Sequence, residues 1–231
     1  MDNKKFDLVD FHSHILPGAD HGSDSLDTSL NQLRLASAEG ITRIIATPHF
    51  YPHRHTLERF LQKRDECAKV LYQATDGSLP TVKLGAEVLL CQGLEKLQDL
   101  DKLCLCGTNY LLLELPFSDF HQEYCYTVEK IMKMGINVIL AHVDRYPEKN
   151  IERLLDVGVD MLQVNADSLD KLFKPKHILE WARRGKVAAL GSDIHGSDAK
   201  AYKHFTKAKS VLGDSLEFLR EKSDFIFNSM K

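Results

Sequence analysis

Short apolar runs recur along the chain, and nearly every run is followed by a residue that can bind a metal ion or a phosphate. Seven such runs are present, over residues 6–10, 41–47, 82–86, 110–113, 138–141, 161–164 and 187–191. They lead into His12 and His14, His49, Glu87, Glu114, His142, Asn165, and Asp193 with His195. Histidines and carboxylates at so many strand ends indicate parallel strands whose C-terminal ends converge, as in β/α barrels.

Segments with a helical period separate these runs. Apolar side chains recur every three or four positions over residues 26–37, 56–73, 124–132, 151–155 and 178–182. Four of the segments end at Gly40, Gly135, Gly158 and Gly185, and an apolar run follows each glycine at once. Such a joint between helix and strand is typical of parallel-sheet folds. Residues 91–107 have the weakest pattern, and we predict short helix and loop there.

The alternation of strands and helices also fits a doubly wound open sheet. That fold would place functional residues in one or two loops at a switch point. Here nearly all the strand ends carry candidate ligands. We therefore predict an α/β fold with a seven-stranded barrel, formed by a single domain over residues 1–231, a length sufficient for such a core.

Composition narrows the class of protein. The net charge of −3 argues against electrostatic nucleic-acid binding. No apolar stretch approaches the length of a membrane span, and the N-terminus lacks the apolar core of a signal peptide. The five cysteines are irregularly spaced, which indicates a reducing cytoplasm. Cys104 and Cys106 form an isolated pair, and we expect them to be inert thiols rather than a zinc site.

The candidate ligands are imidazoles and carboxylates, a set that suits hard and borderline metal ions. His12 and His14 face the same side of an extended strand, so both can reach one ion. Asp193 and His195 repeat this spacing at the last run. His53 and His55 lie deep in a loop, and we expect them to be solvated or to face substrate.

The ordered motifs resemble those of the polymerase and histidinol phosphatase (PHP) superfamily. Within it they are most similar to the bacterial tyrosine-protein phosphatases of capsule and exopolysaccharide operons, the CpsB/YwqE type. The motifs are His12-Ser-His14-Ile-Leu-Pro-Gly-Ala-Asp20, Ala-Thr-Pro-His49, Gly-Ala-Glu87, Leu-Glu114-Leu-Pro-Phe, Ala-His142-Val-Asp-Arg145-Tyr and Ser-Asp193-Ile-His195. The resemblance extends from about residue 7 to residue 198.

The resemblance implies a distorted (β/α)7 TIM-like barrel, the PHP fold, with a cluster of two to three divalent ions. Manganese is the expected metal, with iron or zinc as alternatives. Carried over by motif, His12, His14, Glu87 and Asp193 would hold one ion, Glu87 and His142 a second, and Asp20, His49 and His195 a third. Arg145 would grip the phosphate, Glu114 would act as an acid or orient a ligand, and His142 would serve catalysis as well as metal binding. A surface salt bridge of Arg145 with Asp144 or Glu148 is the alternative.

Two positions depart from the family pattern. His21 stands where the family has an aspartate, and Lys200 stands near a position where relatives often have an arginine. Both positions bear on the substrate or on the third ion.

The expected function is hydrolysis of phosphotyrosine by a metal-bridged hydroxide, a phosphoric monoester hydrolase reaction. Its substrate would be a phosphotyrosine protein, namely a bacterial tyrosine kinase of capsule or exopolysaccharide biosynthesis, with no nucleic-acid partner and no membrane insertion. A PHP phosphoesterase acting on a small metabolite such as histidinol phosphate is the main alternative, and an inactive metal-binding module is another. An amidohydrolase would require a bridging lysine and a further histidine where this chain has Glu114 and Asn165.

Overall fold

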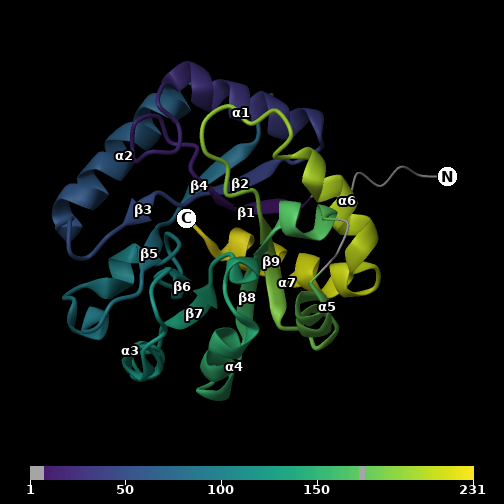
Figure 1. Ribbon diagram of the computed structural model, residues 1–231. Helices are drawn as coiled ribbons and strands as arrows, with labels where there is room; N and C mark the ends of the chain where they lie inside the picture. Colours follow the sequence, from purple (N-terminus) through teal and green to yellow (C-terminus); the bar gives the residue numbers. More distant parts are fainter. Residues whose placement is uncertain (1–7, 172–174) are drawn as a thin grey trace.

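A computed structural model describes residues 8–171 and 175–231 of the chain (Figure 1). Its strands are β1 (Val9–Ser13), β2 (Arg43–Ala46), β3 (His49–Phe50), β4 (Thr81–Leu84), β5 (Glu87–Leu89), β6 (Tyr110–Glu114), β7 (Asn137–Leu140), β8 (Met161–Asn165) and β9 (Val187–Gly191). Its α-helices are α1 (Leu26–Ala38), α2 (Leu57–Ala74), α3 (Gln122–Lys133), α4 (Glu148–Asp156), α5 (Lys176–Arg183), α6 (Lys203–Leu212) and α7 (Ser215–Ser229).

All paired strands of the described chain run parallel, as the apolar runs predict. They form two sheets, with the orders β1-β2-β4 and β3-β5-β6-β7-β8-β9. Nine strands form instead of seven because two of the runs are each followed by a further short strand. Pro48, which has no N–H to donate, separates β2 from β3, and Gly85 with Ala86 separates β4 from β5. The first run begins at residue 6, and its first two residues lie outside the described part.

The five predicted helices are confirmed as α1 to α5. The hydroxyl of Thr56 accepts the N–H of Arg59 and so caps α2, which matches the predicted segment 56–73 to within a residue. The glycines at the four helix-to-strand joints all have positive φ, which a glycine adopts without steric cost. Residues 91–107 contain two 3₁₀ turns, η1 (Leu94–Lys96) and η2 (Leu100–Leu103), as expected.

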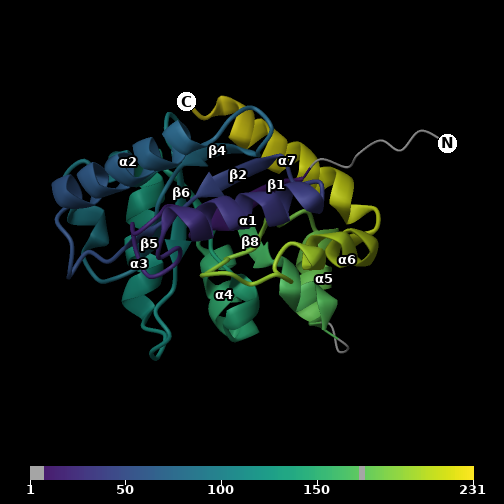
Figure 2. The same ribbon diagram turned by 90° about the horizontal axis from the view of Figure 1, so that it is seen from above.

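Helices α6 and α7 follow the last strand and were not predicted from the sequence. Figures 1 and 2 place α7 on one side of the strands, with the C-terminus near β4. Lys83 on β4 donates its Nζ to the carbonyl oxygens of Phe227 at 2.9 Å and Met230 at 2.7 Å. Arg43 at the start of β2 pairs with Asp224 at 2.9 Å. These contacts hold α7 against the strands at the end remote from the candidate ligands.

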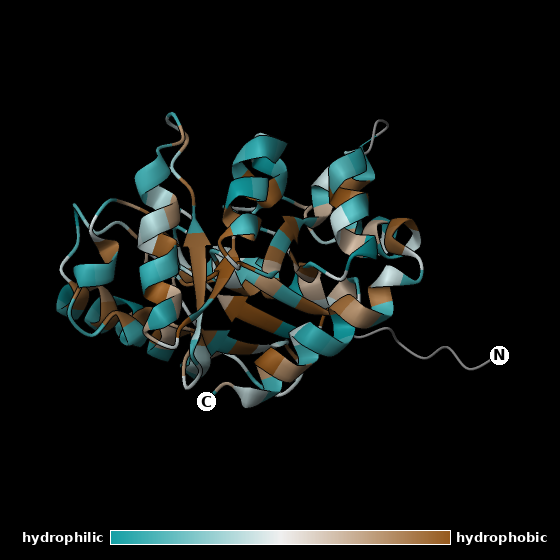
Figure 3. Ribbon diagram, turned by 90° about the horizontal axis from the view of Figure 1, so that it is seen from below, coloured by the Kyte–Doolittle hydropathy of each residue, from teal (hydrophilic) through white to brown (hydrophobic). Residues whose placement is uncertain are grey.

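Two apolar cores result from this arrangement. The larger lies between the strands and the surrounding helices. The smaller contains Phe11, Ile45, Leu112 and Ile139 from strands of both sheets, together with Phe227 of α7. Figure 3 shows apolar strands enclosed by helices whose outer faces are hydrophilic. In the described ranges, no helix has the length and apolar character needed to cross a membrane.

Candidate metal centre

The structure brings the predicted ligands together at the C-terminal ends of the strands. His12 lies in β1, His49 follows the end of β2, Glu87 follows the end of β4, and Glu114 ends β6. Among the described residues, three groups of side chains have possible ligand atoms within 4.8 Å of one another. The groups are His12 with His14 and Glu87, His49 with Glu87 and Glu114, and His14 with His49 and His195.

Glu87 is the centre of this cluster and is fully buried. Its Oε1 lies 2.7 Å from Nε2 of His142, and its Oε2 lies 2.7 Å from Nδ1 of His49. Oε2 also lies 3.3 Å from Nε2 of His12 and 3.3 Å from Nε2 of His14. The two oxygens therefore face different imidazoles, an arrangement that suits a carboxylate shared between two ions.

Asp193 approaches the same imidazoles from the end of β9. Its Oδ1 lies 3.3 Å from Nε2 of His14 and 3.7 Å from Nε2 of His12. Asp193 has a φ of 50° and His142 a φ of 30°, a backbone region that non-glycine residues seldom adopt. Such strain persists where the surroundings hold the residue in place and is concentrated at functional sites.

Two side chains outside the cluster orient its first imidazoles. Nδ1 of His12 lies 2.9 Å from Oε1 of Gln163, and Nδ1 of His14 lies 2.7 Å from Oδ2 of Asp20. Because an amide oxygen and a carboxylate only accept, each Nδ1 carries a proton, and in the neutral ring it is Nε2 that has a lone pair toward Glu87. Metal-binding histidines are commonly held in this way.

Asp20 was predicted to hold the third ion, and it lies at the edge of the cluster. Its Oδ2 also accepts the N–H of His49 at 2.9 Å, and its Oδ1 accepts the N–H of Gly22 at 2.9 Å. Both oxygens are therefore engaged by hydrogen bonds, so Asp20 is placed to orient His14 and His49. Its role as a direct ligand stays a prediction.

Several buried polar atoms at the centre lack a hydrogen-bond partner among the described residues. They are Oε2 of Glu87, Nδ1 of His49, Nδ1 of His142 and Nε2 of His195. The contact between Glu87 and His49 is short, but its geometry is not that of a hydrogen bond. Buried polar atoms are rarely left unsatisfied. Lone pairs of imidazole and carboxylate that face one another fit a set of divalent cations.

The charges of the cluster support the same interpretation. Burial opposes ionisation of Glu87, but the imidazoles of His12, His14 and His142 hold the pKa of that carboxyl well below its usual range. Burial likewise opposes protonation of His14, but the neighbouring carboxylates of Asp193, Asp20 and Glu87 raise the pKa of that imidazole well above its usual value. The buried carboxylates thus stay ionised and require positive charge beside them.

His195 differs from the other imidazoles. Burial and the charge of the neighbouring His14 lower the pKa of His195 to about 4. Its Nδ1 lies 3.0 Å from the carbonyl oxygen of Asp193, which leaves Nε2 directed elsewhere. His195 is therefore neutral near pH 7 and can supply a lone pair.

Sequence reasoning missed the hydrogen-bonded chain that β8 contributes. Nε2 of Gln163 donates to Oδ1 of Asn165 at 2.9 Å, and Nδ2 of Asn165 donates to Oδ2 of Asp193 at 3.1 Å. Oε1 of Gln163 also accepts the N–H of His142 at 2.7 Å. Two amides alternating with apolar residues in a fully buried strand were the signal that could have revealed it.

Asp10 was also missed. It accepts the N–H and the hydroxyl of Ser192 at 2.8 and 2.6 Å, and so joins β1 to the end of β9. Burial raises the pKa of Asp10 to about 6. Its position one residue before Phe11 on a buried strand was the available signal.

Arg145 and Glu114 lie at the edge of the centre. The guanidinium of Arg145 contacts the carboxylate of Asp193, and 40% of its side chain is exposed. The alternative, a surface salt bridge of Arg145 with Asp144 or Glu148, is therefore wrong. Asp144 instead accepts the N–H of Asn165 at 2.8 Å, and Glu148 faces His177. Glu114 lies 3.6 Å from Nε2 of His142.

The two departures from the family pattern differ in position. The ring of His21 stacks on that of His49, with centroids 4.7 Å apart and planes 7° apart, so His21 belongs to the site. Lys200 is exposed in a turn after β9. His53 and His55 are exposed as well, and Nδ1 of His55 accepts the N–H of Tyr51 at 3.2 Å.

Comparison with known proteins bears out the resemblance. The chain is 25% identical to the tyrosine-protein phosphatase CpsB of Streptococcus pneumoniae, over 97% of each chain. It is 31% identical to the tyrosine-protein phosphatase YwqE of Bacillus subtilis strain 168, over 63% of this chain and 56% of the other.

A solved structure from a study of YwqE and CpsB, described as metal-dependent tyrosine phosphatases, shares the fold. Its TM-score is 0.78 at 24% identity, covering 97% of this chain and 96% of the other. The model of the capsular polysaccharide synthesis family CpsB/CapC matches residues 8–221. The chain therefore belongs to the CpsB/CapC family of capsular polysaccharide synthesis.

Proposed function

We propose that this chain is a metal-dependent protein-tyrosine phosphatase, a phosphoric monoester hydrolase. The observation that carries the proposal is the buried Glu87, whose two oxygens face the imidazoles of His49 and His142 without saturating them. The curated relatives that match the chain are named as tyrosine-protein phosphatases, which supports the same activity.

The proposed centre holds two to three divalent ions, with manganese the expected metal and iron or zinc the alternatives. His12, His14, Glu87 and Asp193 would hold the first, Glu87 and His142 the second, and His49, His195 and Asp20 the third. Bound ions of this kind activate water as a nucleophile and neutralise phosphoryl oxygens. The donor set, which contains no thiolate, supports this choice of metals.

Arg145 and Glu114 would add a phosphate-binding group and a carboxyl group to the metal ligands. The guanidinium of Arg145 is partly exposed beside Asp193, so its planar fork can hold two phosphoryl oxygens. The carboxyl of Glu114, 3.6 Å from His142, can hold a proton near the leaving group or orient that imidazole. A tyrosyl leaving group has a pKa of about 10 and needs less help from an acid than an alkyl alcohol does.

An aromatic wall supports an aryl phosphate as substrate. Phe117 is 70% exposed, and its ring lies parallel to that of His142 within 11°. Tyr146 lies 5.6 Å from Phe117, centroid to centroid. Phe117, Tyr146 and Arg145 line a cavity of about 800 Å³ next to the centre. A phenyl ring placed there would find aromatic faces beside the cation that holds its phosphate.

We propose further that the two sheets form one interrupted (β/α)7 barrel within a single domain. The N–H of Asp193 donates to the carbonyl of His12 at 2.8 Å, which joins the end of β9 to β1. The N–H of Gly85 donates to Ala46 at 2.8 Å, and that of Glu87 to Pro48 at 3.1 Å, across the two interruptions. The apolar core shared by strands of both sheets supports the same arrangement.

The proposed substrate is a phosphotyrosine protein, namely a bacterial tyrosine kinase that acts in capsule or exopolysaccharide synthesis. The family description supports a role in capsule synthesis. A cytoplasmic location agrees with five free cysteines, because reducing compartments keep thiols unpaired. Burial also raises the pKa of Cys104 to about 12, which keeps that thiol unreactive.

The decisive experiment combines metal analysis with two substrates. Purified protein is assayed for bound metal, and for turnover of a phosphotyrosine peptide and of histidinol phosphate. We expect manganese, iron or zinc in more than one equivalent, and a far higher kcat/KM for the peptide. Preference for histidinol phosphate would overturn the proposal in favour of a metabolite phosphatase.

A further inference from the structure

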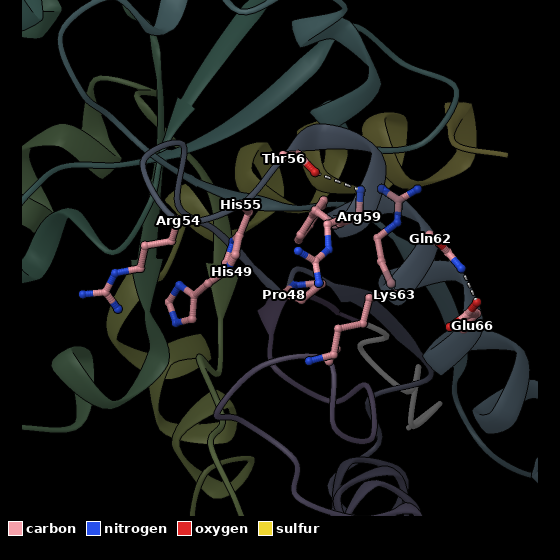
Figure 4. Close-up of a pocket in the computed structure, with 12 residues that line it drawn as sticks. Pro48, His49, Arg54, His55, Thr56, Arg59, Gln62, Lys63 and Glu66 are labelled. Carbon is pink, nitrogen blue, oxygen red and sulfur yellow. Dashed lines mark hydrogen bonds between the residues drawn. The ribbon is translucent and has the colours of Figure 1, made fainter.

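A basic cavity of about 460 Å³ opens beside the metal centre, between the loop after β3 and the first turns of α2. Figure 4 shows its lining side chains, among them His49, Arg54, Arg59 and Lys63. Arg59 and Lys63 are four residues apart on α2 and therefore lie on the same face of the helix.

The cavity is continuous with the metal centre through His49. This residue lines the cavity, and its Nδ1 lies 2.7 Å from Glu87 at the core of the centre. A phosphotyrosine whose phosphate lies at the metal centre beside Arg145 can extend its polypeptide over the neighbouring cavity at His49. Residues next to the phosphotyrosine would then lie over Arg59 and Lys63.

Positive charge in the cavity is largely uncompensated. Arg64 is engaged by Asp65 at 2.9 Å, and the one lining carboxylate, Glu66, accepts from Gln62 at 2.9 Å. Arg54 lies over the ring of Tyr51, 5.6 Å from its centroid. Within residues 8–171 and 175–231, Arg59 and Lys63 make no ion pair, and both are exposed.

The pKa of the neighbouring His55 reflects this excess of positive charge. Burial, together with the charges of Lys63 and Arg54, lowers the pKa of His55 below its usual value. The local charge is thus opposite in sign to the net charge of −3 of the whole chain.

We infer that this cavity binds acidic side chains that flank the phosphotyrosine of a protein substrate, an inference that rests on the proposed phosphatase function. The two unpaired cations of the cavity, Arg59 and Lys63, suit one or two carboxylates of a peptide. A polynucleotide would call for a basic stripe along one face of the protein and for a basic protein overall. Weak individual contacts next to a strongly held phosphate add selectivity between peptides.

The test compares two phosphotyrosine peptides that differ only in their flanking residues, glutamate in one and glutamine in the other. The metal-loaded protein is assayed as wild type, as Arg59→Gln, as Lys63→Gln and as the double variant. Lys69→Gln is the matched control, because Lys69 is exposed on the same helix but does not line the cavity. Thermal unfolding of each variant verifies that it is folded.

We expect the wild type to prefer the acidic peptide by about 10- to 30-fold in kcat/KM, mainly through KM, with each exposed contact worth about 3- to 5-fold. The preference should fall in each single variant, approach unity in the double variant, and persist in Lys69→Gln. High salt should weaken it, because these charges are exposed. Equal kcat/KM for the two peptides in the wild type, or a preference that survives the double substitution, would overturn the inference.

A binding measurement separates this inference from the phosphatase function. Both peptides are made with a non-hydrolysable phosphonate in place of the phosphate, and their Kd values are measured by fluorescence anisotropy. Tighter binding of the acidic peptide without turnover of either phosphotyrosine peptide would sink the phosphatase function while retaining the acidic-peptide site. Turnover of both phosphotyrosine peptides with equal Kd values would overturn the acidic-peptide site while retaining the phosphatase function.

Discussion

Oε1 of Gln163 lies 2.9 Å from Nδ1 of His12, although 151 positions separate the two residues in the chain. The same oxygen accepts the N–H of His142 at 2.7 Å. One buried amide thus sets the tautomer of one candidate ligand and the backbone position of another. This contact makes β8 part of the metal centre, although neither Gln163 nor Asn165 belongs to the predicted set of metal ligands.

Replacement of Gln163 by alanine should therefore weaken the centre without removing any ligand. We expect metal affinity or kcat to fall by about 10- to 100-fold, as for other partners that orient metal-binding histidines. Metal titration beside kinetics on an aryl phosphate measures both effects. Gln73→Ala, at an exposed position on α2, is the control. Unaltered metal affinity and kcat in a folded Gln163→Ala protein would show that the amide has no positioning role.

Removal of metal should abolish activity, and metal binding should be stronger at higher pH. Burial opposes protonation of His142, yet the neighbouring carboxylates of Glu114 and Glu87 raise its pKa to about 9. Below that pH the imidazole must lose a proton to bind an ion, so the apparent affinity should rise as the pH increases from 6 to 8. Titration calorimetry in buffers of different ionisation enthalpy measures the protons released. Activity that survives exhaustive chelation would contradict the metal dependence.

Replacement of His49 or His142 by alanine tests the two imidazoles that contact opposite oxygens of Glu87. Either change should lower turnover by about 10²-fold or more and reduce the metal content, while the fold is retained. His204→Ala is the control, because His204 lies on α6 and pairs with Asp170 at 2.7 Å. Near wild-type rates in a folded His49 or His142 variant would remove that residue from the centre.

Arg145→Lys separates phosphate binding from metal binding. A guanidinium has no lone pair to give to a metal, so metal content should be retained. The lysine keeps a cation near Asp193 but lacks the paired donors. We expect kcat/KM for aryl phosphates to fall by about 10- to several-hundred-fold, which corresponds to about 1.4–3.5 kcal/mol. The exposed Arg183→Lys is the matched control. Unchanged kinetics in both Arg145→Lys and Arg145→Ala would argue against contact with phosphate.

Phe117→Ala should reduce the preference for aryl over alkyl phosphates. An aromatic contact contributes about 0.5–1.5 kcal/mol, so the ratio of kcat/KM values should fall by about 2- to 12-fold. Phe225→Ala provides the control, because Phe225 is 66% exposed on α7 and does not line the site cavity. An equal loss for both kinds of substrate would point to a structural role of Phe117 instead.

Much of the architecture could be predicted from local patterns. Helical period and glycine at the joints located α1 to α5, because both depend on residues that are near neighbours in the chain. The position of His12, His49, Glu87 and His142 at strand ends was enough to predict that they meet. Parallel strands of one fold direct their C-terminal ends to the same face, so convergence follows from direction alone.

Other features depend on which distant segments meet in space. The local sequence pattern carries no information on the partner of a polar atom. The sequence therefore could not predict that Arg145 contacts Asp193 and not Asp144. The amide of Gln163 and the carboxylate of Asp10 acquire their roles only because burial leaves each one few partners. Helix α7 was missed for a related reason. It is held by Lys83, more than 140 positions away, and by a core to which both sheets contribute.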